Sequence, residues 1–260
     1  MASIKWDHTV HYINDLQKAI EKFNEEGLIA FMGGSHKQWG TYNALSYFDL
    51  CYIEFLGVEN RGLAESIAEP NDVVKDSVKL LPDREELSRV ALRTEDIEEV
   101  REQLSAFQLD MSPIMDGKRL DAQGNLIEWK MMTIAGEYQG LPYPFVIQWM
   151  GADQERRERL KDSGIIQEHP VGDVRITEAV FDVEDPEAVA KHWQELFGFE
   201  RKSTGGVTPD SREVKLAVGD QTFVFKQGRL NRLQQLLFHT AAPELKGKTM
   251  TIGEGEYTFA

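Results

Sequence analysis

The sequence predicts an α+β protein made of repeated βαβββ modules, with curved mixed sheets and helices on the outside. The strands are predicted by short runs rich in aromatic and β-branched residues, such as residues 52–56. The order of a strand, a capped helix and further strands starts again near residues 87 and 174. This recurrence indicates an internal repeat.

The first module, residues 1–60, shows this order most clearly. Asp15 is a helix-capping residue, and Leu16, Ile20 and Phe23 form the apolar stripe of the helix that follows it. The predicted elements are a strand at 5–13, this helix, a strand at 28–32, a glycine-bearing segment at 33–43, and strands at 44–48 and 52–56.

Two connecting segments divide the rest of the chain. Residues 61–86 are a linker with short helices, and residues 153–162 are a charged crossover. Module two covers 87–151, so the two modules are expected to form one cup over residues 1–151. Residues 170–260 are expected to form a smaller, degenerate second half whose last module is truncated.

Composition limits the classes of partner. The chain has 260 residues, with 44 acidic and 29 basic side chains and a formal net charge of -15. This charge disfavours binding to nucleic acid or to anionic membranes, which require a basic face. The chain enters a strand almost at once, which leaves no room for a signal peptide. The single cysteine, Cys51, fits a reducing compartment, so we expect a cytoplasmic protein.

Two polar residues stand out inside predicted strands. Glu54 lies in the middle of an apolar run, and His8 has a similar place in the first strand. A carboxylate among apolar neighbours is costly unless it has a partner. The sequence therefore predicts a small cup with polar chemistry at its base.

Several short segments resemble a known family. Strands that carry Asp7-His8 and Tyr52-Ile53-Glu54 within βαβββ units are similar to the vicinal oxygen chelate superfamily, which includes glyoxalases, bleomycin-resistance proteins and extradiol dioxygenases. The resemblance is closest to the uncharacterised glyoxalase-like domain family. The segments that carry this closer resemblance are Gly33-Gly34 with His36, Gly40-Thr41, Asn43, Pro144-Phe145 with Trp149, and His169-Pro170.

The resemblance implies a site at the base of the cup. In the superfamily, paired modules hold a divalent metal on side chains from the first and last strands of each module. The matching positions in module one are His8 and Glu54. Those in module two are assigned to Arg89 and Gln148, and all four side chains are expected to converge.

Two interpretations of this set remain open. In one, His8 and Glu54 hold Zn, Mn, Fe or Ni, with Gln148 or His36 as a third ligand. In the other, no metal binds, and the Arg89 guanidinium forks onto Glu54 while His8 and Gln148 complete a hydrogen-bond network. The second is favoured, because a permanent cation beside the two remaining ligands repels a divalent ion.

Five residues are candidate contacts to a substrate. His36 and Asn43 lie in the glycine-bearing segment, and Arg119 and Trp129 lie on neighbouring strands of module two, where they suit an anionic or flat molecule. Gln148 is the fifth. Each also has a purely structural interpretation, as a residue that shapes the backbone or forms a surface cation-π pair.

The sequence favours two functions for the first cup. One is a glyoxalase-like enzyme, a metal-dependent lyase, isomerase or dioxygenase that acts on a small oxygenated molecule. Glu54 is then a ligand or general base, His8 a ligand or proton carrier, and Arg89 an oxyanion stabiliser. The alternative is a metal-free protein that binds or sequesters a small molecule without turnover. A homodimer is a further expectation, because paired-module folds often dimerise.

Overall fold

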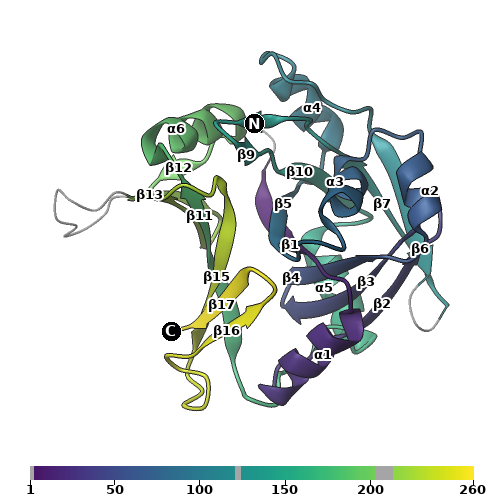
Figure 1. Cartoon of the computed structure of the whole chain (residues 1–260), viewed down its shortest axis with the longest axis vertical. Helices are drawn as coiled ribbons and strands as arrows, with labels where there is room; N and C mark the ends of the chain where they lie inside the picture. The colour runs from purple at the N-terminus through teal and green to yellow at the C-terminus, as the bar shows by residue number, and fades with distance from the viewer. Residues whose placement is uncertain (1–2, 121–123, 203–212) are drawn as a thin grey trace.

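The computed structural model describes residues 3–120, 124–202 and 213–260. The chain is an α+β protein with two strongly curved mixed sheets (Figure 1). The strands of the first sheet lie between residues 5 and 149, and those of the second lie between residues 174 and 259. No helix in these described ranges is both long and apolar enough to span a membrane.

The first sheet has the strand order β2-β3-β4-β1-β5-β10-β7-β6. In the order of the chain, its elements and their covering helices are β1 (Lys5–Tyr12), α1 (Leu16–Glu25), β2 (Phe31–His36), β3 (Thr41–Phe48), β4 (Cys51–Val58), α2 (Arg61–Ser66), α3 (Asp72–Leu80), β5 (Leu87–Arg93), α4 (Ile97–Leu104), β6 (Met115–Leu120), β7 (Leu126–Met132) and β10 (Phe145–Trp149). The minor hairpin of β8 (Glu137–Tyr138) and β9 (Leu141–Pro142) precedes β10.

The second sheet has the order β12-β13-β14-β11-β15-β17-β16. It follows helix α5 (Asp153–Asp162), and its elements are β11 (Val174–Val183), α6 (Pro186–Phe197), β12 (Glu200–Arg201), β13 (Glu213–Val218), β14 (Gln221–Gln227), β15 (Arg232–Thr240), β16 (Thr249–Ile252) and β17 (Gly255–Phe259). The predicted charged crossover at 153–162 is thus a helix.

The same capping residue begins the main helix of each of three modules. The side chains of Asp15, Asp96 and Asp185 accept hydrogen bonds from the backbone N–H groups of Lys18, Glu99 and Ala188, three residues later. These carboxylates satisfy donors that the first turn of a helix leaves free. In each of the three modules, the helix of the predicted repeat therefore begins at an aspartate that caps its first turn.

The second strand of the first module lies further along the chain than predicted. Gly33 and Gly34, which the prediction placed after a strand at 28–32, lie inside strand β2, which pairs with β3 across a register shift. A Cβ on Gly33 would lie 2.3 Å from Asn43 Oδ1, and Gly34 has a φ of 144°. Glycine is required here because the backbone passes close to a neighbour and bends.

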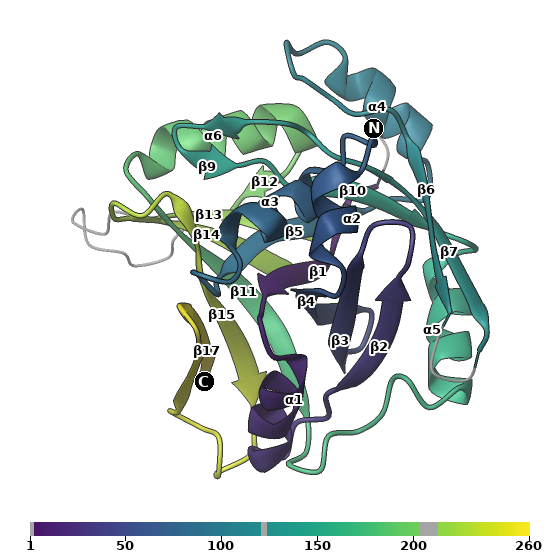
Figure 2. The same ribbon diagram turned by 45° about the vertical axis from the view of Figure 1, so that its right-hand side comes forward.

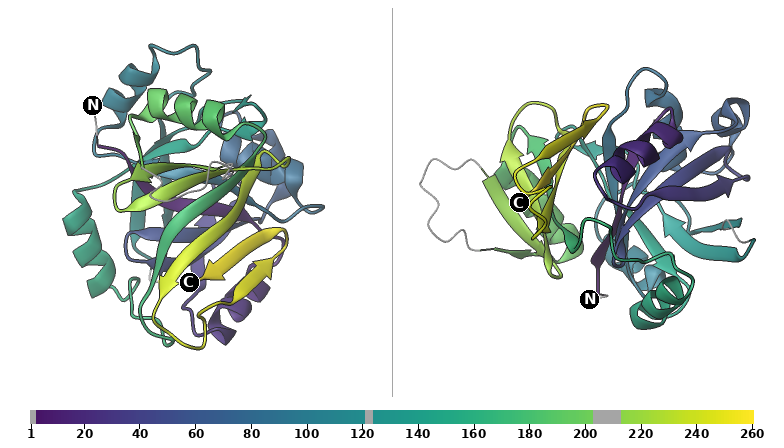
Figure 3. Two further views of the ribbon diagram at one scale, coloured as in Figure 1. Left: turned by 90° about the vertical axis from the view of Figure 1, so that its left-hand side faces the viewer. Right: turned by 90° about the horizontal axis from the view of Figure 1, so that it is seen from below.

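The second sheet packs against the outer, convex face of the first (Figure 3). Trp6 meets Phe223 edge to face, and Phe48 meets Phe238 in the same way. On β1, His11 faces this interface and hydrogen bonds to the Tyr257 hydroxyl, whereas His8 faces the concave side. This division follows from the alternation of side chains along a strand. It leaves the concave side of the first sheet free to form a site.

The first sheet curls until its two edge strands, β2 and β6, meet (Figure 2). The contact is made by side chains: Arg119 Nη1 donates to the Gly33 carbonyl at 2.7 Å, and Gln38 Nε2 donates to the Lys118 carbonyl at 3.0 Å. The α2–α3 linker covers another side, where the Tyr12 hydroxyl donates to the Val73 carbonyl at 2.8 Å. The concave face is therefore enclosed.

Candidate functional site

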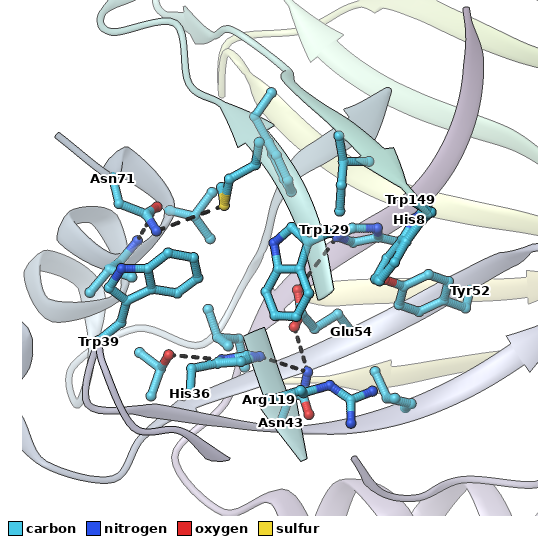
Figure 4. A pocket seen from close by; sticks show the side chains of 18 residues that line it. His8, His36, Trp39, Asn43, Tyr52, Glu54, Asn71, Arg119, Trp129 and Trp149 are labelled. Atoms are coloured by element: carbon cyan, nitrogen blue, oxygen red, sulfur yellow. Dashed lines mark hydrogen bonds and ion pairs between the residues drawn. The ribbon is translucent and has the colours of Figure 1, made fainter. Parts of the chain in front are cut away.

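A cavity of about 50 Å³ lies inside the curled first sheet (Figure 4). One half of its lining is polar and comes from module one: His8, His36, Thr41, Asn43 and Glu54. The other half is apolar and aromatic, and it includes Trp129, Met131, Phe145, Ile147 and Trp149 from module two. The remaining lining residues are Trp39, Leu45, Tyr52, Leu56, Asn71, Val73, Val74 and Arg119.

A bulge at Asp7 sets the geometry of the polar half. Trp6 pairs with Leu92 of β5, but His8 pairs with Ala91, so Asp7 is the extra residue in β1. A bulge lets adjacent side chains turn to the same side of a strand. Asp7 Oδ1 accordingly lies 2.7 Å from His8 Nδ1, and both residues are buried, with 0% and 2% exposure.

Asp7 is surrounded by donors. Arg156 Nη1 donates to its Oδ2 at 2.8 Å, and the Trp149 indole N–H lies 3.2 Å from both carboxylate oxygens. Burial favours the neutral acid, but the Arg156 charge and the hydrogen bond to His8 outweigh burial, so the pKa of Asp7 lies well below its usual value. Asp7 is thus a buried, ionised group that orients the imidazole.

Glu54 lies on the other side of His8. Its Oε2 is 3.5 Å from His8 Nε2, and Asn43 Nδ2 donates to its Oε1 at 2.6 Å. Burial alone would raise the pKa of Glu54, but hydrogen bonding and charge from His8 lower it to about 2. The pKa of His8 is raised by the hydrogen bonds to Asp7 and Glu54, although burial opposes this. Both carboxylates therefore favour the protonated form of the His8 imidazole, which lies between them and is stacked on the Tyr52 ring at 4.5 Å.

His36 extends the polar half in a neutral form. Its Nδ1 lies 3.0 Å from Thr41 Oγ1, and its Nε2 lies 3.5 Å from Asn43 Nδ2. Burial lowers the pKa of His36 to about 4. Because Asn43 Nδ2 is a donor, the ring proton is assigned to Nδ1, which donates to Thr41. A hydrogen-bonded chain thus runs from Asp7 through His8, Glu54 and Asn43 to His36.

The predicted convergence of Arg89 on this site is wrong. Arg89 Nε donates to Asp76 Oδ2 at 2.9 Å, and its Nη1 donates to the carbonyls of Tyr143 and Ile134 at 2.6 and 3.3 Å. The residue opposite His8 on β5 is Ala91. Arg89 lies two residues from Ala91 along β5, which is a distance of about 7 Å. It therefore binds Asp76 of α3 and does not reach Glu54.

The predicted position of Gln148 is wrong as well. Its Oε1 accepts from the Ile97 backbone N–H at 2.9 Å, at the beginning of α4. The cavity is lined instead by Phe145, Ile147 and Trp149, which alternate with Gln148 along β10. Gln148 therefore lies on the other face of the strand.

The strand registers allow a direct test of a metal site. His8 pairs with Tyr52 in module one, and Ala91 pairs with Phe145 in module two, while His8 and Ala91 face each other. Ala91 is therefore the counterpart of His8, and Ile147 is the counterpart of Glu54. Neither offers a donor atom, and the described residues contain no group of three His, Cys, Asp or Glu side chains suited to a metal. A divalent ion held by both modules does not fit these residues.

The other predicted contacts do meet at the cavity. His36, Asn43, Arg119 and Trp129 all line it, and Figure 4 shows Trp129 beside Glu54, and Arg119 beside Asn43. The Trp129 ring lies across Gly117 on the neighbouring strand, where a Cβ would be 2.2 Å from it. This contact holds the ring over the cavity.

Three residues of the site were missed from the sequence: Asp7, Trp149 and Arg156. Asp7 is next to His8, but a regular strand would direct it away. Arg156 lies on the highly charged α5, whose side chains resemble an ordinary solvated helix surface. Its guanidinium nevertheless lies over the Trp149 ring at 4.3 Å and is 4% exposed.

Comparisons with known proteins agree with this fold. The family model described as "Glyoxalase-like domain" matches residues 6–197. A hypothetical protein from Staphylococcus aureus has a similar structure, with a TM-score of 0.82, 21% identity and 99% of each chain covered.

Two named enzymes have the same fold with weaker similarity. A mutant of 4-hydroxymandelate synthase from Streptomyces coelicolor has a TM-score of 0.53 and 10% identity, over 92% of this chain and 72% of that one. A variant of homoprotocatechuate 2,3-dioxygenase from B. fuscum has a TM-score of 0.51 and 14% identity, over 94% of this chain and 59% of that one. None of the curated proteins matches this chain. The chain belongs to the glyoxalase-like domain family, and its fold is that of the vicinal oxygen chelate superfamily.

Proposed function

We propose that the cavity binds a small oxygenated molecule and that His8 and Glu54 transfer a proton on it without a resident metal. The observation that carries this proposal is the Asp7–His8–Glu54 chain. A buried aspartate fixes one imidazole nitrogen, so the other nitrogen and a carboxylate are presented to an aromatic cavity. Buried charges that face a cavity are costly for stability and are typical of functional sites.

The chemistry that this arrangement supports is proton transfer beside a carbonyl. The substrate oxygen accepts the His8 Nε2 proton, and Glu54 removes a proton from the adjacent carbon. The products of this step are the enol, a neutral His8 and a protonated Glu54, and the reverse step returns both protons. A substrate oxygen that takes the His8 hydrogen bond also removes the contact that holds the pKa of Glu54 near 2, so Glu54 becomes a stronger base when the ligand binds.

Hydrogen exchange tests this proposal directly. A panel of 2-oxo acids, 2-hydroxy aldehydes and 1,2-dicarbonyl compounds is incubated with the protein in D₂O, and loss of the carbon-bound proton is followed by NMR. We expect His8→Asn and Glu54→Gln to slow exchange at least about a hundredfold. Glu65→Gln, which changes a surface carboxylate on α2 paired with Arg61, is the matched control. Equal exchange rates in wild type and Glu54→Gln would refute the proposal.

A second function is favoured by the apolar half of the cavity. Ala91 and Ile147, the module-two counterparts of His8 and Glu54, have apolar side chains. The cavity is also enclosed by β2, β6 and the α2–α3 linker, which suits a protein that holds a ligand. In this case the protein sequesters a small molecule. Tight binding of a panel compound that is recovered unaltered, with no exchange, would support this function over the first.

A further inference from the structure

We infer that the natural ligand carries an anionic group, a carboxylate or a phosphate, and that this group binds in a second chamber beside the cavity. This inference rests on the proposed ligand site in the cavity and defines its ligand class. The second chamber, called the vestibule below, has a volume of about 380 Å³. It is lined by Arg119, Arg156, Arg159 and Trp149, with Leu126 and Ile127 as apolar walls.

The vestibule and the cavity share two walls. Arg119 and Trp149 line both chambers, so a ligand that extends from one to the other passes these side chains. The inner chamber, at about 50 Å³, has room for only a small reacting group. The vestibule provides the volume of hundreds of Å³ that small-molecule sites typically need.

The charge of the vestibule differs from that of the chain. Acidic residues outnumber basic ones by 44 to 29 overall, yet among the residues that the structure describes, three arginines and one carboxylate, Glu128, line this chamber. Glu128 is exposed and lies opposite Lys118 on the neighbouring strand. Neither Arg119 nor Arg159 makes an ion pair with a carboxylate of the described residues; they donate to the carbonyls of Gly33 and Met150.

Arg156 supplies an independent observation. Its Nη1 is held by Asp7 at 2.8 Å, and its guanidinium lies over Trp149. Its Nη2 is buried and has no hydrogen bond of good geometry among the described residues, and the Tyr47 side chain, which also lines the vestibule, is the polar group beside the guanidinium. A buried guanidinium N–H without a partner is costly, and an anion in the vestibule would relieve this cost. The arginine fork suits the planar oxygens of carboxylates and phosphates.

Matched ligands test the inference through binding alone. Phenylacetate, phenyl phosphate and the neutral phenylacetamide are titrated into the full chain, with calorimetry and tryptophan fluorescence as readouts. We expect at least one anion to bind more tightly than the amide, and Arg119→Gln and Arg159→Gln each to weaken that anion about tenfold or more. The amide should bind Arg159→Gln and the wild type equally, because Arg159 lines the vestibule but not the cavity. Whichever anion binds more tightly identifies the group as carboxylate or phosphate.

A neighbouring arginine provides the control. Arg157 lies on the same helix but pairs with Asp49 outside the vestibule, so Arg157→Gln should leave anion binding unchanged. Arg156 is kept, because its loss would remove the arginine that is hydrogen-bonded to the buried Asp7 carboxylate. The inference is overturned if neither anion binds more tightly than the amide, or if Arg157→Gln weakens the anion as much as Arg119→Gln does. If an anion binds as expected but no compound of the exchange panel loses its carbon-bound proton, the proton transfer alone is contradicted.

Discussion

Replacing Glu54 by glutamine should remove a defined, pH-dependent part of the stability. Glutamine keeps the shape of the side chain and an acceptor for Asn43, but it removes the charge that faces His8. In the folded protein the pKa of Glu54 falls from 4.5 to about 2, and at 1.36 kcal/mol for each pH unit this corresponds to about 3 kcal/mol. Because the folded pKa is the lower one, this stabilisation is present above pH 4.5 and is lost as the pH falls toward 2.

The assay is urea unfolding of wild type and Glu54→Gln between pH 7 and pH 3, followed by tryptophan fluorescence. The difference in unfolding free energy between the two proteins should shrink by about 2 kcal/mol over this range. The pKa of His8, measured by NMR, should fall in the variant because Glu54 is one of the two groups that raise it. A difference in free energy that does not change with pH, together with an unchanged His8 pKa, would refute the assignment of a buried charge chain.

Three further changes test other parts of the site. Asp7→Asn should destabilise the protein by about 3–5 kcal/mol, as measured by urea unfolding, because it leaves a buried guanidinium unpaired; a loss below 1 kcal/mol would contradict this. Gly117→Val should displace the Trp129 ring, with a shift in tryptophan fluorescence and a loss of about 1–3 kcal/mol; an unchanged spectrum would show that the ring does not rest on this glycine. Ala91→His combined with Ile147→Glu should restore a four-ligand set and give near-stoichiometric zinc in elemental analysis; metal content equal to that of the wild type would contradict the register argument.

The sequence was sufficient for the fold because its signals are local. Capping aspartates, alternating strands and their repetition define each module without knowledge of distant contacts. Strand β2 was the exception, since Gly33 and Gly34 are ordinarily signs of a turn. These glycines are explained only by the close approach of Asn43 and of the opposite sheet edge, which are tertiary contacts.

The sequence placed His8 and Glu54 together but assigned the wrong partners in module two. Strand β10 is buried on both faces, so Phe145, Val146 and Ile147 are all apolar and their pattern does not reveal which face is concave. Gln148 was therefore assigned to the wrong face. Arg89 was assigned to the wrong position along β5, because the residue that faces His8 depends on irregularities in the pairing of β1 with β5 that have no local signal in the sequence.

The bulge at Asp7 connects these results. It shifts the register so that His8 faces Ala91, and it brings a second carboxylate to the imidazole. The charged side chains around the imidazole thereby lie in module one and on α5, while module two contributes mostly apolar side chains together with Arg119. A site divided in this way favours a ligand with a polar reacting group and an apolar body, and the arginines of the vestibule add a requirement for an anionic end. The asymmetry between two similar modules is thus the feature from which the specificity of this site follows.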